Sequence, residues 1–411
     1  MHFPISNRRF SKRVHRTPAA LSIYINEIVY TLKRRGTDVT TLSLGEAFFD
    51  IPMFDFGKLD FVKGYHYCDS QGLPELRQVI SQFYGHQYGV AVDGDNEVLV
   101  TAGSKAAIYL AILAVLQEGD EALIHEPAWL SYQEHIRLAD AEACFIPFSV
   151  SVEGFETYFT PKTRLLIISN PNNPAGKVYN PQELQLLAQL CRRKGAWLLV
   201  DEAYSDFATP GTFHSALEYD PDRTTTIVAN SLSKNLGMSG WRIGYIISNP
   251  DLVGQVLKLN QHIITCAPTI LQAYLARYFD QILALTLPQA QDIAEKRARV
   301  AERMKSLGIS ALSGGATFYF FISIGDFPAS SLDFSLYLLL AHNIAVVPGS
   351  AYGASTERFV RLSIGTESEE RIEEALAVIA NTLYSKPNVA SFVSDQLAAL
   401  NVASFSTGND V

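Results

Sequence analysis

The chain has 411 residues, of which 48% are hydrophobic and 18% are charged, and its formal net charge is −9. This length exceeds what one hydrophobic core usually serves, so we expect about two domains. The negative charge disfavours a nucleic-acid partner, and no apolar run is long enough to span a membrane. The four scattered cysteines lack metal-ligand spacing, which predicts reduced thiols in the cytoplasm and no metal site.

The first residues are basic, and five cations stand close together with no acid among them: Arg8, Arg9, Lys12, Arg13 and Arg16. A transit peptide has this composition, and that alternative stays open. The following Thr17-Pro18 is typical of a helix start, because threonine caps a helix and proline fits its first turn. We therefore predict an amphipathic helix over residues 17–35 that ends at Gly36.

The middle of the chain alternates short apolar runs with helical patterns. We predict strands over residues 97–100, 122–125, 164–168, 197–200 and 225–228, and helices from Ser104 and over residues 181–191. This alternation predicts an α/β fold in which helices cover both faces of a mostly parallel sheet. Because ligands bind at the carboxyl ends of such strands, we expect the functional site at that edge.

The pattern changes near Pro288. We predict a charged helix over residues 289–307, an apolar strand over 318–324, and a last strong helix that opens at 367–370. We interpret residues 53–287 as a large domain, and residues 1–52 with 288–385 as a smaller α+β domain. Residues 386–411 are rich in Ser, Ala, Asn and Asp, so we expect a flexible extension there.

The most informative segment runs from Ser231 to Tyr245 and contains Lys234. Its amine, hydroxyls, glycines and guanidinium suit a phosphorylated aldehyde, bound covalently by the amine and electrostatically through its phosphate. The segment resembles the lysine motif of the class I/II aminotransferases, and about residues 17–385 resemble the aspartate-aminotransferase type, fold type I. That family uses pyridoxal 5′-phosphate. The resemblance implies a seven-stranded sheet in the large domain, with Lys234 as covalent anchor and general base.

The same resemblance assigns cofactor roles to other motifs. Asp201 would pair with the protonated pyridine nitrogen, Tyr204 and Asn173 would bind the 3′-oxygen, and Trp129 would stack on the ring. The phosphate would be bound by two groups of residues and by one tyrosine of the neighbouring subunit: Gly103, Ser104 and Lys105 at a predicted helix start, Ser231, Ser233 and Arg242 in the lysine segment, and Tyr67. Tyr67 thus implies a homodimer with shared active sites.

The resemblance also implies a substrate site. Arg361 would bind the α-carboxylate bidentately beside Asn173, and Gly45 belongs to a segment that closes over the substrate. Lys105 stands where one branch of aspartate aminotransferases has a lysine for the distal carboxylate. Arg358, which would lie on the opposite face of the strand, is the less favoured carboxylate ligand.

Other interpretations of single residues stay open. By itself, Asp201 is also a plausible helix cap, Asn173 a member of an ordinary Asn-Pro turn, Tyr67 a packed aromatic, and Lys105 a solvated lysine. The chain also departs from the common family pattern in two places: Ala175 stands for a threonine, and Ala47-Phe48 stand for Pro-Asp.

The predicted function is transamination with ping-pong kinetics, from an L-amino acid to a 2-oxo acid such as 2-oxoglutarate. Acidic donors, aspartate or glutamate, are favoured because of Lys105. Aromatic donors come next, because Phe318, Tyr319 and Tyr352 are expected near the pocket. Two alternatives remain: another fold type I enzyme that uses the same cofactor, such as a β-lyase, synthase or oxidase, and a regulator with a degenerate domain.

Overall fold

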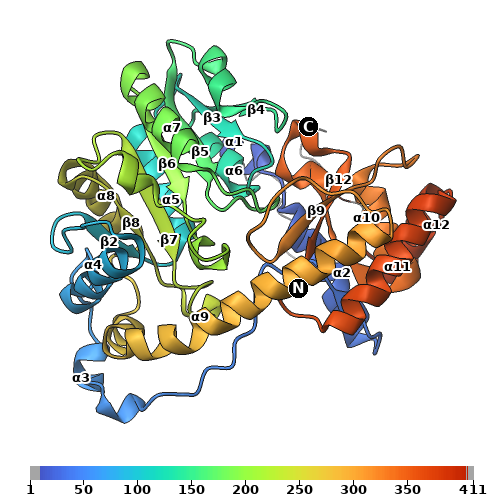
Figure 1. Ribbon diagram of the computed structural model, residues 1–411, viewed down its shortest axis with the longest axis horizontal. Coiled ribbons are helices and arrows are strands. Elements are labelled where there is room, and N and C mark those ends of the chain that lie inside the picture. The colour runs from blue at the N-terminus through green and yellow to red at the C-terminus, as the bar shows by residue number, and fades with distance from the viewer. Residues whose placement is uncertain (1–9, 404, 406–411) are drawn as a thin grey trace.

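The computed structural model describes residues 10–403 and residue 405. Arg8, Arg9 and the end of the predicted C-terminal extension lie outside the described residues. The long helix α9 (Thr269–Ser306) connects the two parts of the molecule (Figure 1). A large sheet with its helices lies around the first half of α9, and a smaller group of helices and short strands lies around its second half.

Seven strands form the large sheet, as predicted, in the order β2-β8-β7-β6-β5-β3-β4. Strand β8 runs antiparallel to both of its neighbours, and the other pairs are parallel. The bounds are β2 Val98–Thr101, β3 Glu121–His125, β4 Glu142–Ile146, β5 Thr163–Ser169, β6 Trp197–Asp201, β7 Thr226–Ser231 and β8 Gly244–Ile247. Six strands therefore share one direction, and their carboxyl ends meet at one edge of the sheet.

Helices cover both faces of the sheet, because successive side chains of a strand point to opposite sides. In β5, Leu165 and Ile167 belong to one core, whereas Leu166 and Ile168 belong to the other. The first core is closed by α5 (Ser104–Val115), α6 (Ser131–Leu138) and α8 (Pro250–Ile263). The second is closed by α4 (Pro74–Tyr88), α7 (Pro181–Lys194) and the first half of α9.

The smaller part of the molecule has a core of its own, built from segments near both ends of the chain. Strand β1 (Thr40–Thr41) pairs in parallel with β10 (Ile344–Ala345), and a second small sheet has the order β11-β12-β9. The other bounds are α2 Leu21–Arg34, β9 Tyr319–Ser323, α10 Ser331–His342, β11 Val347–Pro348, β12 Phe359–Ser363 and α11 Glu369–Ser385. The division at residue 287 stays a prediction, because α9 crosses it without a break.

The predicted helix start at residue 289 is wrong. Helix α9 begins 20 residues earlier, at Thr269, and passes through Pro288. Proline removes one backbone hydrogen bond from a helix. Buried Ile282 and Ala290 hold the turns on either side of it in two different cores, so tertiary packing outweighs that loss.

The predictions for the two ends of the chain also need correction. The helix predicted over residues 17–35 begins only at Leu21, as α2, because Thr17 and Ala20 on either side of Pro18 are extended, and a separate short helix α1 (Lys12–Arg16) precedes it. The segment predicted to be flexible contains helix α12 (Ala390–Leu400), whose Val393 and Leu397 are buried against α10 and its neighbours. Among the described residues, no helix is both long and apolar enough to cross a bilayer.

We expect Gly244, at the start of β8, to tolerate no side chain. An added Cβ would lie 2.6 Å from the carbonyl carbon of Gly103 and 2.9 Å from Cα of Ser104, so the start of α5 would have to move. Gly244→Ala should therefore lower the free energy of unfolding by about 1–3 kcal/mol, the range for overpacking. Denaturant unfolding measures this loss.

Gly240→Ala is the matched control, since an added Cβ there meets nothing within 4 Å. Equal stability of the two variants would contradict the close packing of β8 on the start of α5.

Candidate active site

A pocket of about 510 Å³ opens at the carboxyl edge of the large sheet, where the two parts of the molecule meet. It is lined by every predicted site residue except Gly103 and Tyr67: Gly45, Ser104, Lys105, Trp129, Asn173, Asp201, Tyr204, Ser231, Ser233, Lys234, Arg242 and Arg361. Sheet geometry explains the convergence. Asp201 ends β6, Ser231 ends β7, and the Asn173 loop follows β5, so three parallel strands deliver polar groups to one place.

Lys234 lies in the centre of this pocket. Its Nζ donates a hydrogen bond to the carbonyl oxygen of Gly45 and lies 5.7 Å from the centre of the Tyr204 ring. Burial lowers the pKa of the Lys234 amine to about 8, and the nearby carboxylate of Glu46 opposes this shift. The amine is therefore partly neutral near physiological pH, as a nucleophile or a general base must be.

Asp201 is buried beside the lysine, and burial raises the pKa of its carboxyl group. The Tyr132 hydroxyl donates to Oδ2 at 2.7 Å, and the Ala203 amide donates to Oδ1 at 3.1 Å. These two donors favour the ionised form, which would attract a positive charge into the pocket. Sequence analysis assigned no role to Tyr132, although it follows Trp129 by three residues in the same motif.

A second group of residues forms an anion cradle at the start of α5. No side chain caps this helix, so its first amides are open to a ligand. The Arg242 guanidinium donates to Ser233 Oγ at 3.4 Å and to the Ser239 carbonyl at 2.7 Å. Gly103 has φ +85°, and an added Cβ would overlap that guanidinium, so glycine lets the cation approach the helix.

Arg361 forms the opposite wall. Arg361 is 5% exposed, and its guanidinium donates to the Ser43 carbonyl at 2.8 Å and to Asn173 Oδ1 at 3.5 Å. It lies over the Tyr319 ring, 4.4 Å from the centroid. No ion pair of Arg361 with an acidic side chain occurs among the described residues. A buried cation of this kind suits a carboxylate ligand. Arg358 instead donates to three backbone carbonyls.

Several pocket contacts were not foreseen from the sequence. The Tyr204 and Tyr319 hydroxyls lie 2.9 Å apart and share a hydrogen bond. Ser239 Oγ donates to Glu46 Oε1 at 2.6 Å and so links the lysine segment to the Gly45 segment. The only available sequence signal was the position of Glu46 in the motif that contains Gly45.

Lys105 and Trp129 form one side of the pocket together. Lys105 Nζ lies 5.1 Å from the centre of the Trp129 ring, within reach of a cation–π interaction. Burial lowers the pKa of the Lys105 amine, and the positive charge of Arg242 adds to that effect. The cation thus lines the pocket from the first turn of α5.

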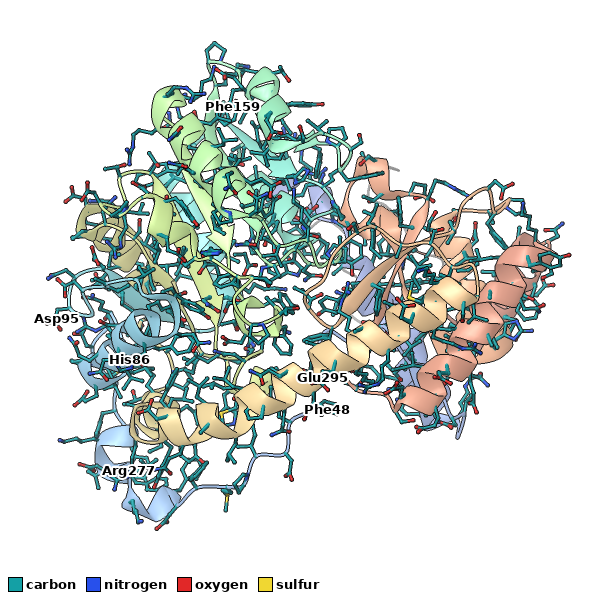
Figure 2. All side chains as sticks on the ribbon, viewed as in Figure 1. Phe48, His86, Asp95, Phe159, Arg277 and Glu295 are labelled. Carbon is teal, nitrogen blue, oxygen red and sulfur yellow. The ribbon has the colours of Figure 1, made fainter. Side chains whose placement is uncertain are left out.

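Tyr67, a predicted site residue, and Phe48, which departs from the family pattern, both lie away from this lining. Tyr67 is 83% exposed in the described chain. Phe48, where the family often has an aspartate, is exposed beside the middle of α9 (Figure 2). Two residues later, the backbone of Asp50 makes two hydrogen bonds with the Gln289 side chain.

The residues present fit pyridoxal 5′-phosphate. Lys234 offers an amine with a lowered pKa, Asp201 a buried carboxylate, and Arg242 a cation beside open helix amides. A Cβ at Gly103 would overlap the Arg242 guanidinium, so glycine at this position lets that cation stand beside the open amides. Each charged part of the cofactor therefore has a complementary group in one pocket.

The lowered pKa of Lys234 leads to a prediction for the cofactor-free protein. In the unfolded chain the amine has a pKa of about 10.4, so folding releases a proton between about pH 8 and pH 10. The unfolded state then binds more protons, and stability rises with pH across this window. Lys234→Met removes the amine, so its stability relative to the unsubstituted chain should fall by about 2 kcal/mol between pH 7 and pH 10.

Urea unfolding at both pH values measures the difference. Lys162→Met, at an exposed position, is the matched control. A stability difference for Lys234→Met that is the same at pH 7 and pH 10 would show that burial does not shift this amine.

Comparison with known proteins identifies the family. The family described as "Aminotransferase class I and II" matches residues 52–379. The chain is 31% identical to an aspartate aminotransferase of Thermotoga maritima over 92% of its own length and 100% of that protein. It is 31% identical to the (5-formylfuran-3-yl)methyl phosphate transaminase of Methanocaldococcus jannaschii, covering 86% and 93% of the two chains.

A solved aromatic aminotransferase of Pyrococcus horikoshii has a TM-score of 0.80 and 29% identity, and the match covers 87% of this chain and 99% of that one. The match of fold and sequence thus extends over most of the chain. Since class I/II aminotransferases depend on pyridoxal phosphate, the fit of Lys234, Asp201 and Arg242 to that cofactor agrees with these similarities. The chain belongs to the class I and II aminotransferases and is a pyridoxal-phosphate-dependent transaminase.

Proposed function

We propose that this transaminase moves the amino group of an acidic L-amino acid, aspartate or glutamate, to a 2-oxo acid such as 2-oxoglutarate. The buried Arg361, which has no acidic side-chain partner among the described residues and faces the same pocket as Lys234, is the observation that carries the proposal. Lys105 adds a second cation on the wall of the same pocket, and it would bind the distal carboxylate of an acidic donor. The name of the Thermotoga maritima relative supports the same substrate class.

Lys234 and Asp201 would have different roles in the reaction. Lys234 would hold the cofactor covalently and, once freed by the substrate amine, would move a proton from the substrate α-carbon. When bound, the cofactor supplies an electron sink for the charge left on that carbon. Asp201 would keep the ring nitrogen protonated, with Tyr132 and Ala203 fixing the carboxylate.

The other residues of the pocket would bind and orient the cofactor and the substrate. Asn173 and Tyr204 would bind the 3′-oxygen, and Trp129 would stack on the ring. Phosphate binding would use the cradle at the start of α5: Gly103, Ser104, Lys105, Ser231, Ser233 and Arg242. Arg361 would fix the substrate α-carboxylate. The Gly45 segment would cover the reacting atoms and exclude water.

A homodimer with shared sites is part of the proposal. Tyr67 lies in a stretch whose large apolar side chains are unusually exposed: Met53, Phe61, Val62, Tyr65 and Tyr67. A contiguous stretch of this kind favours burial against a second chain. A second copy that covers it would place Tyr67 close to the partner's phosphate cradle. The cytoplasm remains the predicted location, and all four cysteines are free thiols, as that compartment requires.

Another reaction of the same fold type is the alternative, because sequence similarity does not fix which substrate bond is broken. Aromatic donors are the alternative within transamination, supported by Tyr319 and Tyr352 beside Arg361 and by the name of the Pyrococcus horikoshii structure. A half-reaction separates the classes. A transaminase stops in the aminated cofactor form until an oxo acid restores it, whereas a lyase continues to release ammonia. A panel of amino donors ranks the substrates by kcat/KM.

Lys105→Met tests the acidic specificity, because it keeps the side-chain stem and removes the charge. A hydrogen bond to a charged group contributes about 1.5–3 kcal/mol. We therefore expect kcat/KM for aspartate and glutamate to fall roughly ten- to a hundredfold, with little change for phenylalanine and alanine. Saturating cofactor in the assay excludes an effect on phosphate binding. An equal loss for all four donors would contradict the proposal.

Mixed dimers test the shared site. Lys234→Ala and Tyr67→Ala should each be nearly inactive as homodimers. Mixed in equal amounts, they should recover about a quarter of the unsubstituted activity, because half of the dimers then hold one complete site. Lys234→Ala mixed with Arg361→Ala is the control and should recover none, since both of these residues act in the same chain. Activity of an isolated monomer would contradict the shared site.

A further inference from the structure

The chain continues beyond the residues that match its family, and this segment returns to the N-terminal helix. The family match ends at residue 379, while the structure also describes α12, the residues after it to 403, and residue 405. The Tyr24 hydroxyl donates to the Ala403 carbonyl at 3.0 Å, and the Tyr24 ring lies 5.2 Å from that of Phe405. Arg35 donates to the Leu400 carbonyl at 3.3 Å. Residues 390–405 are called the C-terminal strap below.

The helix that the strap contacts lines the substrate pocket. Helix α2 contributes Ser22, Ile23, Asn26 and Tyr30 to the lining. Ile23 and Tyr30 are 55% and 52% exposed, whereas the opposite side of the helix is buried in the smaller core through Ile25, Ile28 and Val29. One face of α2 therefore packs in the smaller core, and another face lines the pocket.

A chain of hydrogen bonds leads from α2 to the carboxylate-binding arginine. Ser43 Oγ donates to Asn26 Oδ1 at 2.7 Å. The carbonyl oxygen of the same Ser43 accepts a hydrogen bond from Arg361 at 2.8 Å. Because Ser43 and Arg361 are both buried, a shift of α2 at Asn26 changes the surroundings of the guanidinium.

The N-terminal end of helix α2 has no side-chain cap. Its N-cap residue is Ala20, which makes no side-chain capping bond, so the first amides lack partners from a cap. Tyr24 lies one turn into the helix, and its contacts with Ala403 and Phe405 fall at this weak end. Phe405 also lines a cavity of about 420 Å³ with Leu21 and Leu130, and Leu130 lines the substrate pocket as well.

We propose that the C-terminal strap, through Tyr24, positions α2 against the substrate pocket, and that Tyr24 is a positioning residue for substrate binding. The inference rests on the proposed role of Arg361 in binding the α-carboxylate. Neither Tyr24 nor Phe405 lines the pocket that contains the cofactor cradle and Lys234. Their loss should therefore weaken substrate binding and leave the chemical step and cofactor binding intact.

Two variants remove the contact in different ways. Tyr24→Phe keeps the ring and removes the hydroxyl that donates to Ala403. A chain that ends at Val402 removes Ala403 and Phe405 but keeps α12 and the hydrogen bond between the Val402 amide and the Leu397 carbonyl. Tyr384→Phe, at a fully solvated position of α11, is the matched control for the hydroxyl.

The holoenzyme of each variant is assayed with the amino donor that has the highest kcat/KM in the panel. For Tyr24→Phe we expect KM to rise about three- to tenfold, the effect of one neutral hydrogen bond, with kcat within about twofold. The shortened chain should show at least the same rise in KM. Cofactor content and thermal midpoint should stay close to those of the unsubstituted protein, and Tyr384→Phe should change neither KM nor kcat.

Arg361→Lys separates this inference from the proposed function. If Arg361→Lys leaves KM unchanged, the proposed α-carboxylate site is wrong. If Arg361→Lys raises KM but Tyr24→Phe and the shortened chain do not, the positioning role of the strap is wrong. A lower thermal midpoint with unchanged KM in either strap variant would assign the segment to stability alone and overturn the inference. A fall in kcat without a rise in KM would also overturn it.

Discussion

Burial of charged groups in one pocket is the constraint on which the rest of this structure depends. Lys234, Asp201 and Arg361 lie in one pocket, and each is removed from bulk water. Desolvation disfavours the charged form, which lowers the pKa of the lysine and raises that of the aspartate. A cationic ring nitrogen would pair with Asp201, and a carboxylate would pair with Arg361. Ligand binding would therefore offset the free-energy cost of burying these charges.

The fold keeps the charges in place through close backbone contacts between the two parts of the molecule. Gly176, after the Asn173 loop, faces the Ala316 carbonyl, and Gly314 faces the Ala175 carbonyl. Any side chain at these glycines would separate the two parts and open the pocket. Helix α9 adds a continuous rod whose halves belong to different cores, so neither part can move far without bending it.

Much of the large sheet was predictable because its strands are buried on both faces. Strands β5 and β6 are near-continuous apolar runs, the pattern expected of strands that helices cover on both faces. Strand β4, at the edge of the sheet, carries Glu142 and Cys144 and lacks that signal. Strand β8 was missed because it follows the glycine-rich lysine segment directly. The predicted start of α9 was placed after Pro288 because proline usually interrupts a helix, but here packing in two cores keeps the helix continuous.

The chemical groups of the candidate site could be predicted from the sequence, because they stand in short motifs at strand ends. Lys234, Asp201, Asn173 and Arg361 could each be found from their neighbours, and the parallel sheet then brings three of those motifs together. The tertiary structure alone decided which partners support them. Tyr132 reaches Asp201 across 69 residues, Ser43 reaches Arg361 across 318, and Tyr24 reaches Ala403 across 379. Such contacts arise from packing between distant segments, and no local pattern of residue types records them.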